Sequence, residues 1–231
     1  MIMLPLPALP EQDLRLESSE PSRGEPDNGS VPPMVGRIAL GGPLAVPVTP
    51  DYVAADPALQ AFVAREAAHS VYHIAHLSVS FAAKPATPRL HTASIELMLS
   101  SDGQEWEPVA WSMSPLLVTD PVRVERRFRL GPELKLQDME LSLGEVGKTV
   151  SRQQTEVFLR AQRELRSDPA WEFNRTKSMS MYGSYRLVMV VRSARHGVTS
   201  MRVTVRVATK GNLLRWYRSD LPEPMSVTAI L

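Results

Sequence analysis

The chain contains no cysteine among its 231 residues. A disulfide framework, a thiolate metal site and a cysteine nucleophile are therefore excluded, and the redox compartment is left open. Long apolar runs are missing as well, so no segment has the length of a membrane-spanning helix. The apolar N-terminal stretch has no basic residues and is broken by prolines, which does not fit a signal peptide. We expect a cytoplasmic protein without a membrane partner.

The chain also lacks a surplus of either charge, with a formal net charge of +1 at pH 7. The acidic side chains are unevenly placed, because residues 1–35 carry six acidic and two basic residues and leave the remainder mildly basic. This charge falls well short of the concentrated basic surface of a dedicated nucleic-acid binder, so we do not predict a nucleic-acid partner. Arginine outnumbers lysine 21 to 5, which favours a bacterial source with a GC-rich genome.

The first 35 residues have a composition of their own. They are rich in proline, glutamate, serine and glycine, and ten of the twenty prolines lie within the first fifty residues. A segment of this kind buries too little apolar surface to offset the entropy of ordering it. We therefore predict a disordered arm over residues 1–35 and a single domain over residues 36–231, which is long enough for a sizeable core.

Alternation of apolar and polar residues dominates the domain. Four runs have apolar side chains at every second position, with Arg126 as an interruption in one of them, which is the pattern of strands with one buried and one solvated face. Their apolar positions are Ala75, Leu77, Val79 and Phe81; Ile95, Leu97 and Leu99; Val122, Val124, Phe128 and Leu130; and Met201, Val203, Val205 and Val207. The run YRLVMVVRS is apolar on both faces and predicts a central strand. The fold class that follows is mostly β (α+β), an antiparallel β-sandwich of about eight to ten strands.

Two segments have the features of helices. Asp56, a capping residue followed by proline at the first helical position, predicts a helix near 57–69. Ser151 and Gln154 stand at capping-box spacing ahead of an apolar stripe at helical spacing, which predicts a second helix near 151–166. We expect both helices to connect strands of the sandwich.

A possible phosphate-binding loop precedes the second predicted helix. Gly147, Lys148 and Thr149 match the end of the nucleotide-binding loop pattern. The first glycine of that pattern is replaced by Ser142, and a helix starting at Ser151 would leave Lys148 and Thr149 outside its first turn. A glycine-containing turn is the preferred interpretation, and a nucleotide-binding switch at these residues is the less favoured alternative.

Three of the five histidines fall within eight residues. His69 and His73 stand at helical spacing and would reach one metal ion, with Glu66 or His76 as a further ligand or base. From about residue 72 onward, however, the alternation is that of a strand, which places His73 and His76 on opposite faces. A metal-dependent hydrolase that uses this cluster is therefore kept as an alternative.

Two further groups of residues suggest binding. Five arginines on two predicted strands would form a basic face if those strands are neighbours, and such a face would attract phosphate, an acidic partner or the acidic arm. These are Arg123, Arg127, Arg129, Arg202 and Arg206. Trp106 and Trp111 have carboxylates nearby and suggest a sugar platform. They are an odd number of residues apart, so along one strand they would face opposite sides and form no platform.

We find no catalytic constellation that satisfies these geometric tests. The sequence therefore favours a non-enzymatic binding or assembly module, a bacterial accessory protein whose partner is another protein or its own subunit, and no cofactor is expected. The question of enzymatic activity is left open by the metal and nucleotide alternatives.

Overall fold

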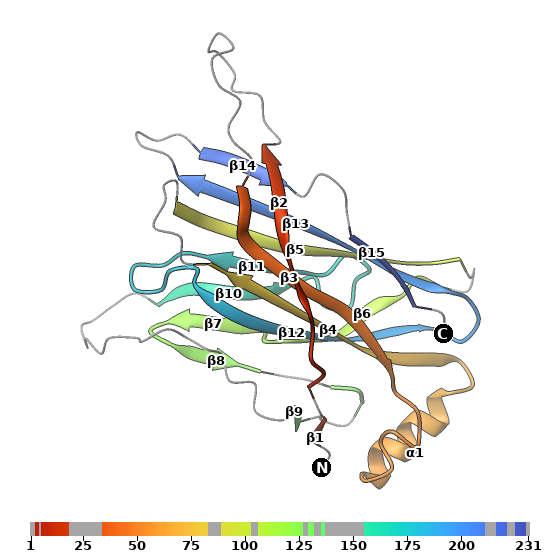
Figure 1. The fold of residues 1–231 in the computed structure, drawn as a ribbon. Helices are drawn as coiled ribbons and strands as arrows, with labels where there is room; N and C mark the ends of the chain where they lie inside the picture. The colour runs from red at the N-terminus through yellow and green to blue at the C-terminus, as the bar shows by residue number, and fades with distance from the viewer. Residues whose placement is uncertain are drawn as a thin grey trace.

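The computed structural model has two antiparallel β-sheets packed face to face and a helix at one end of the molecule (Figure 1). The predicted fold class, a mostly β antiparallel sandwich, is confirmed. The structure describes residues 3–4, 6–18, 34–82, 89–102, 106–126, 129–131, 135–136, 155–210, 216–220 and 225–229.

The strands divide into two sheets and one small pair. Sheet I contains, in spatial order, β6 (Val109–Ser114), β12 (Gly183–Ala194), β4 (Ser70–Phe81), β3 (Met34–Pro47) and β2 (Glu11–Ser18). Sheet II contains β14 (Trp216–Asp220) and β15 (Met225–Ala229) along one side of β13 (Thr199–Lys210), followed by β5 (Arg89–Ser101), β11 (Ala170–Asn174), β10 (Glu156–Gln162), β7 (Leu117–Asp120) and β8 (Arg123–Glu125). A separate parallel pair joins β1 (Met3–Leu4) to β9 (Lys135–Leu136).

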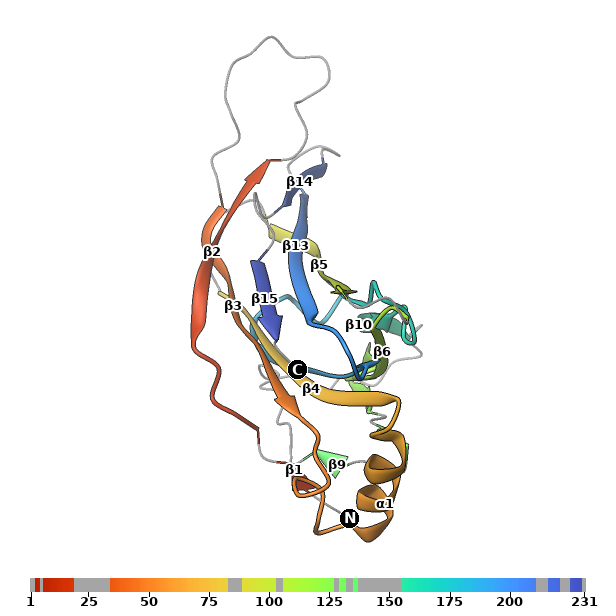
Figure 2. The same ribbon diagram turned by 90° about the vertical axis from the view of Figure 1, so that its right-hand side faces the viewer.

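The two sheets meet along one side of the molecule. Ser18 of β2 pairs with Ser219 of β14, and Glu17 pairs with Asp220, so a strand of sheet I is hydrogen-bonded to a strand of sheet II. Figure 2 shows the two layers from the side, with β2 and β3 in one layer and β13 and β5 in the other. The first long strand and a strand near the end of the chain therefore join the two layers.

The main core lies between the sheets. Phe81, Phe158, Phe173 and Tyr185 form an aromatic group with ring centroids 5.1 to 6.1 Å apart, mostly edge to face, which is a favourable geometry for aromatic rings. The predicted alternating runs that begin at residues 75, 95 and 201 correspond to β4, β5 and β13, and their apolar side chains line this core. The sequence periodicity was thus sufficient to identify the inner faces of these three strands.

The run predicted over residues 122–130 forms a strand over a much shorter stretch. Its strand β8 covers three residues, and Val124 packs against the main core. Leu130 is buried elsewhere, in the second core on the outer face of sheet I. The alternation of this run therefore extends across two separate environments.

Sheet I is buried on its outer face as well. Ile74 of β4 and Val188 and Val190 of β12 form a second core with Leu59 and Val63 of α1 (Pro57–Glu66). The predicted central strand is confirmed as β12, which lies between β4 and β6. The predicted first helix is also confirmed, and the Asp56 side chain caps it by accepting hydrogen bonds from backbone N–H groups of the first turn.

The prediction of disorder over residues 1–35 is wrong for residues 11–18. These residues form β2, which pairs with β3, and Leu14 and Leu16 are buried in the main core. Their apolar side chains alternate with charged ones, a strand pattern that the polar composition of the arm obscured. Residues 6–10 lie against the outer face of sheet I, where Arg186 donates a hydrogen bond to the Pro7 carbonyl at 2.9 Å. Residues 19–33 are outside the described part.

The prediction of a helix near 151–166 is also wrong. Residues 156–162 form β10, which pairs with β7 on one side and with β11 on the other. The register with β7 shifts between Val157 and Leu159, and this irregularity allows Phe158 and Leu159 to be buried at consecutive positions. Two consecutive apolar residues are also typical of the buried face of a helix, so the sequence pattern was ambiguous. Pairing with β7 and β11 on both sides outweighs the modest helix propensity of the segment. Residues 151–154 lie outside the described residues.

Candidate binding site around Arg192

Arg192 lies near the end of β12 on the outer face of sheet I, next to two indole rings. Its guanidinium carbon is 5.0 Å from the ring centroid of Trp106 and 5.2 Å from that of Trp111. Its Nε and Nη2 atoms donate hydrogen bonds of 3.0 and 2.9 Å to Ser70 Oγ at the start of β4. Cation–π contacts of this kind stabilise partly exposed arginines by about 1 kcal/mol. The guanidinium is therefore held by stacking and by hydrogen bonds together.

A further set of contacts connects Arg192 to α1. Glu66, the last residue of the helix, has a carboxylate oxygen 3.7 Å from Arg192 Nη2 and accepts a 3.4 Å hydrogen bond from the Tyr72 hydroxyl. The ring of Tyr72 packs between those of Phe62 and Trp111, with centroid distances of 5.7 and 6.3 Å. Burial, only partly offset by the positive charge of Arg192, raises the pKa of Tyr72 to about 12. The hydroxyl therefore stays protonated and acts as a donor.

The site combines three regions of the chain that are distant in sequence: α1 with the adjoining β4, the region around β6, and β12. β12, β4 and α1 supply the arginine, the tyrosine and the glutamate, and Trp111 comes from β6 with its indole N–H donating to the Leu130 carbonyl at 3.0 Å. Trp106 precedes β6 and lies in the segment that leads into it. Arg192 thus contacts both indoles, and the Trp111 ring is also held by its hydrogen bond to the Leu130 carbonyl.

The arrangement is suited to binding. The side chain of Arg192 is 31% exposed and that of Glu66 is 26% exposed, and both indoles are half-buried. Tryptophan, tyrosine and arginine are the residue types enriched in the binding hot spots of protein interfaces. The tyrosine is held protonated and the glutamate is ion-paired, so the group forms a contact surface that combines aromatic rings with a positive charge.

Trp106 and Trp111 contact the same side chain, so the prediction that they face opposite sides is wrong. An odd separation puts side chains on opposite faces only when both residues lie on one strand. β6 begins at Val109, so the alternation rule does not extend to Trp106, and both rings reach the same arginine. The signal available in the sequence was the density of aromatic and acidic residues at 105–111.

The predicted metal cluster does not come together. His73 and His76 lie on opposite faces of β4, as the strand alternation requires, while His69 is exposed and Glu66 binds Arg192 and Tyr72. Across the described ranges, no group of three potential metal ligands converges. Burial lowers the pKa of both His73 and His76 to about 4, with the positive charge of Arg186 adding to the effect at His76. Both rings are therefore neutral near pH 7.

The predicted arginine face is not formed. Arg123 lies on β8, at the far edge of sheet II from β13, which carries Arg202 and Arg206; the strands β5, β11, β10 and β7 intervene. Arg129 lies against sheet I, where its backbone N–H donates to a serine hydroxyl of β6. Arg127 is outside the described residues. The condition that the two arginine-bearing strands are neighbours therefore fails.

The outer face of sheet II carries mixed charge. Arg206 forms an ion pair of 2.9 Å with Glu96 on the adjacent strand β5. Arg206 pairs with Ser94 of β5, and Ser94 pairs in turn with Glu172 of β11. Glu172 is paired on its other side with Arg160 of β10, so these two opposite charges are cross-strand neighbours. Opposite charges on neighbouring strands compensate one another across this face.

The nucleotide alternative concerns residues outside the described part of the chain. Lys148, Thr149 and the predicted helix start at Ser151 all belong to the segment 137–154, which the structure does not describe. The next described element is the strand β10, where the pattern requires a helix. A nucleotide site at Lys148 and Thr149 therefore remains an untested hypothesis.

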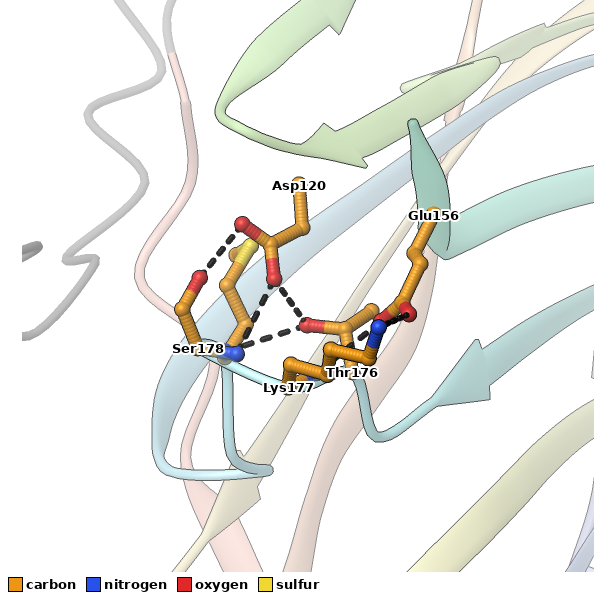
Figure 3. Close-up of polar contacts among 6 residues, drawn as sticks. Asp120, Glu156, Thr176, Lys177 and Ser178 are labelled. Atoms are coloured by element: carbon orange, nitrogen blue, oxygen red, sulfur yellow. Dashed lines mark hydrogen bonds and ion pairs between the residues drawn. The ribbon is translucent and has the colours of Figure 1, made fainter. Parts of the chain in front are cut away.

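A second polar cluster surrounds Asp120 at the end of β7 (Figure 3). Its Oδ2 atom accepts hydrogen bonds from the Thr176 hydroxyl at 2.5 Å and from the Ser178 backbone N–H at 3.1 Å. Its Oδ1 atom accepts from the Ser178 hydroxyl, and Thr176 Oγ1 accepts from the Met179 backbone N–H at 3.0 Å. The carboxylate therefore binds the segment that leads from β11 in sheet II to β12 in sheet I.

The electrostatics of this cluster favour a structural role. Burial opposes ionisation of Asp120, but the hydroxyl donors of Ser178 and Thr176 and nearby backbone N–H groups outweigh it and lower the pKa of Asp120. A carboxylate with a lowered pKa is a poor general base for the neighbouring serine. Glu156 extends the cluster by accepting from the Lys177 backbone N–H at 2.9 Å and pairing with its ammonium at 3.7 Å. The cluster fixes a crossover between the sheets.

Comparison with protein-family models, with curated proteins and with solved structures returned no match. The site around Arg192 must therefore be interpreted from its own chemistry. Within the described residues, no helix combines the length and the apolar character needed to cross a bilayer.

Proposed function

We propose that this chain is a non-enzymatic binding or assembly module that contacts a partner protein through Trp106, Trp111 and Arg192. The observation that carries the proposal is the position of the Arg192 guanidinium against two half-buried indoles. Such a surface offers apolar area at a reduced entropic cost, because Arg192 is already held by Ser70 and Glu66, and Trp111 by the Leu130 carbonyl.

The composition and position of the site support a protein partner. The site combines exposed aromatic edges with one charge and lies at the junction of α1 with sheet I, where rigid elements position it. In protein interfaces, a truncated hot-spot side chain of this type typically costs about 2 kcal/mol or more of binding energy. The partner is expected to be another protein or a second copy of this chain.

The test uses two substitutions that leave the core intact. Trp106→Ala removes the ring that precedes β6, and Arg192→Lys keeps the charge but loses the planar stacking. Proteins cross-linked to the wild-type chain in cells are identified, purified and titrated by calorimetry against each variant. Arg206→Ala, a substitution on the opposite sheet, is the matched control. We expect both site variants to bind roughly thirtyfold more weakly and the control to bind like the wild type.

Self-association and catalytic activity are tested separately. If a second copy is the partner, sedimentation of the wild-type chain reveals an oligomer that Trp106→Ala dissociates. Unchanged affinity in both site variants would contradict the proposed surface. Turnover in a broad hydrolase panel that is lost on replacing one polar residue would contradict a non-enzymatic role.

A further inference from the structure

Arg186 has an incompletely satisfied charge. It lies on β12, on the same outer face of sheet I as Arg192, and its side chain is half-buried. Its hydrogen-bond partner is the neutral carbonyl of Pro7 at 2.9 Å, and among the described residues no carboxylate forms an ion pair with it. The nearby Glu11 carboxylate accepts from the Ser184 hydroxyl instead. A half-buried guanidinium without a counter-ion favours the arrival of an anionic group.

Beside Arg186, two residues of β4, Ser78 and His76, form a surface that we call the floor. This floor contains buried polar atoms that have no hydrogen-bond partner among the described residues. Ser78 lies directly opposite Arg186 in the pairing of β4 with β12, and His76 is two residues along β4 on the same face. Both residues are at least nine-tenths buried, and Ser78 Oγ and both ring nitrogens of His76 have no hydrogen-bond partner. An unsatisfied buried donor or acceptor costs on the order of 1–3 kcal/mol. The segment that covers this floor therefore leaves these polar atoms without hydrogen bonds.

The covering is the chain's own N-terminal segment. Leu6 packs against the second core, Pro7 accepts from Arg186, and Leu9 lies over Gly41 of β3. A Cβ atom at Gly41 would be 3.2 Å from the Leu9 Cβ, so the glycine permits this close approach. An extended peptide thus fits the face from the second core to Gly41 of β3, which pairs with Ser78 of β4.

We propose that this face is a binding site for an extended acidic peptide and that residues 6–10 occupy it as an internal competitor. In this arrangement the Pro7 carbonyl stands where a carboxylate of the peptide would bind Arg186. Apolar side chains of the peptide take the positions of Leu6 and Leu9. This face does not include Trp106, Trp111 or Arg192, so the proposal goes beyond the proposed function and adds a second binding surface with its own class of partner.

The test measures binding of two labelled peptides by fluorescence anisotropy. One has the sequence of residues 4–10, LPLPALP, and the other is LPLEALP, with glutamate at the position of Pro7. The full-length variant Leu6→Ala/Leu9→Ala weakens the internal competitor. We expect it to bind LPLEALP more tightly than the wild type does, and roughly tenfold more tightly than it binds LPLPALP.

Substitutions of two arginines, one on each sheet, show where the peptide binds. In the Leu6→Ala/Leu9→Ala background, Arg186→Met is expected to weaken binding of LPLEALP roughly tenfold or more. Arg202→Met, at an exposed position of β13 in sheet II, is the matched control and is expected to leave peptide binding unchanged. Because Arg186 is not part of the group formed by Trp106, Trp111 and Arg192, the peptide titrations and the partner titrations with Trp106→Ala report on separate sites, and failure of one is distinguishable from failure of the other.

A reversible disulfide, here called the lock, tests whether residues 6–10 must leave the face before the peptide binds. It does so without removing any part of the fold. The chain has no cysteine, so Leu9→Cys/Gly41→Cys introduces a single possible disulfide across a gap close to the required Cβ separation. Ser78 Oγ must rotate to another staggered position to admit the new side chain. We expect the oxidised protein to exclude LPLEALP and the reduced protein to bind it.

Three results would overturn the proposal. Equal binding of the two peptides would remove the role of the acidic group, and Arg186→Met with unchanged affinity would remove the role of the arginine. Oxidised and reduced lock variants that bind equally, or that both fail to bind, would show that residues 6–10 are a permanent part of the fold.

Discussion

Leu165 has a φ angle of 63° and a side chain that is 58% exposed. It belongs to the turn between β10 and β11, where Arg163 also has a positive φ, of 59°. The left-handed region disfavours residues with a Cβ atom by about 1–2 kcal/mol. Beyond the strand β10, these two residues are also incompatible with the helix predicted near 151–166, since a continuous helix requires negative φ throughout.

Replacing Leu165 by glycine is therefore expected to stabilise the protein. The backbone strain is released, the exposed apolar side chain has little packing to lose, and the 2.8 Å hydrogen bond from the residue 165 N–H to the Ala110 carbonyl is kept. After the added entropy of the unfolded chain is counted, we expect a gain of about 0.5–1 kcal/mol in the free energy of unfolding. Urea denaturation of Leu165→Gly measures it, and a lower midpoint than in the wild type would refute the strain.

His73 and His76 make stability depend on pH. Burial lowers the pKa of each ring to about 4 in the folded protein, while an unfolded histidine titrates near 6.5. Between these values the unfolded chain binds more protons, so stability falls as the pH decreases from about 6.5 to about 4. The expected slope is about 1.4 kcal/mol per pH unit for each histidine.

The measurement is a series of urea denaturation curves from pH 7 to pH 4. His76→Phe is expected to reduce the slope, because a titrating group is removed, and His69→Ala is the control at an exposed position. A slope that is unchanged in His76→Phe would show that the acid sensitivity arises elsewhere.

At the scale of elements, the crossover between β11 and β12 depends on Asp120. Its carboxylate accepts from two hydroxyls and a backbone N–H, so Asp120→Ala leaves these buried or half-buried donors without their acceptor. We expect a loss of about 1–3 kcal/mol in unfolding free energy. Asp168→Ala, which breaks an exposed ion pair with Arg163, is the control and should cost at most about 1 kcal/mol.

The charge of Asp120 gives this prediction a pH dependence. The folded pKa is lowered, so the carboxylate contributes stability above its unfolded pKa, and that contribution is lost as the pH falls through the folded pKa. The destabilisation by Asp120→Ala should therefore shrink in strong acid. An equal difference between wild type and variant at neutral and acid pH would contradict the role of the charge.

The elements also show what the sequence could and could not reveal. Strands β4, β5 and β13 follow from period-two alternation, because one face of each is buried between the sheets. The segment over 156–162 was mistaken for a helix because its bulge buries two consecutive residues, and the sequence does not encode the neighbours that cause this. The Arg192 site was missed for a similar reason: the α1–β4 region, the region around β6, and β12 meet only in the tertiary fold.

At the scale of the whole molecule, the N-terminal residues are part of the sandwich. Deleting residues 1–18 removes Leu14 and Leu16 from the main core, each worth about 1.5–3 kcal/mol of burial, together with the pairing of β2 to β3 and β14. We expect this deletion to abolish cooperative thermal unfolding. Deleting residues 1–10 should lower the melting temperature but preserve a cooperative transition, because β2 remains.

Calorimetry of the two truncated chains separates these outcomes. If residues 1–18 were disordered, as the composition of the arm predicts, both deletions would leave the melting temperature unchanged. If the deletion of residues 1–18 keeps the wild-type transition, the contribution of β2 to the core is refuted.

The contact between β2 and β14 has a consequence for how the protein is made. Ser18 and its partner Ser219 are separated by roughly 200 residues, so the N-terminal strand leaves the ribosome long before its partner has been synthesised. The two layers can be joined only after translation has passed β14. During that interval β2 has an unpaired edge, and this is the period in which a nascent chain would benefit most from a chaperone.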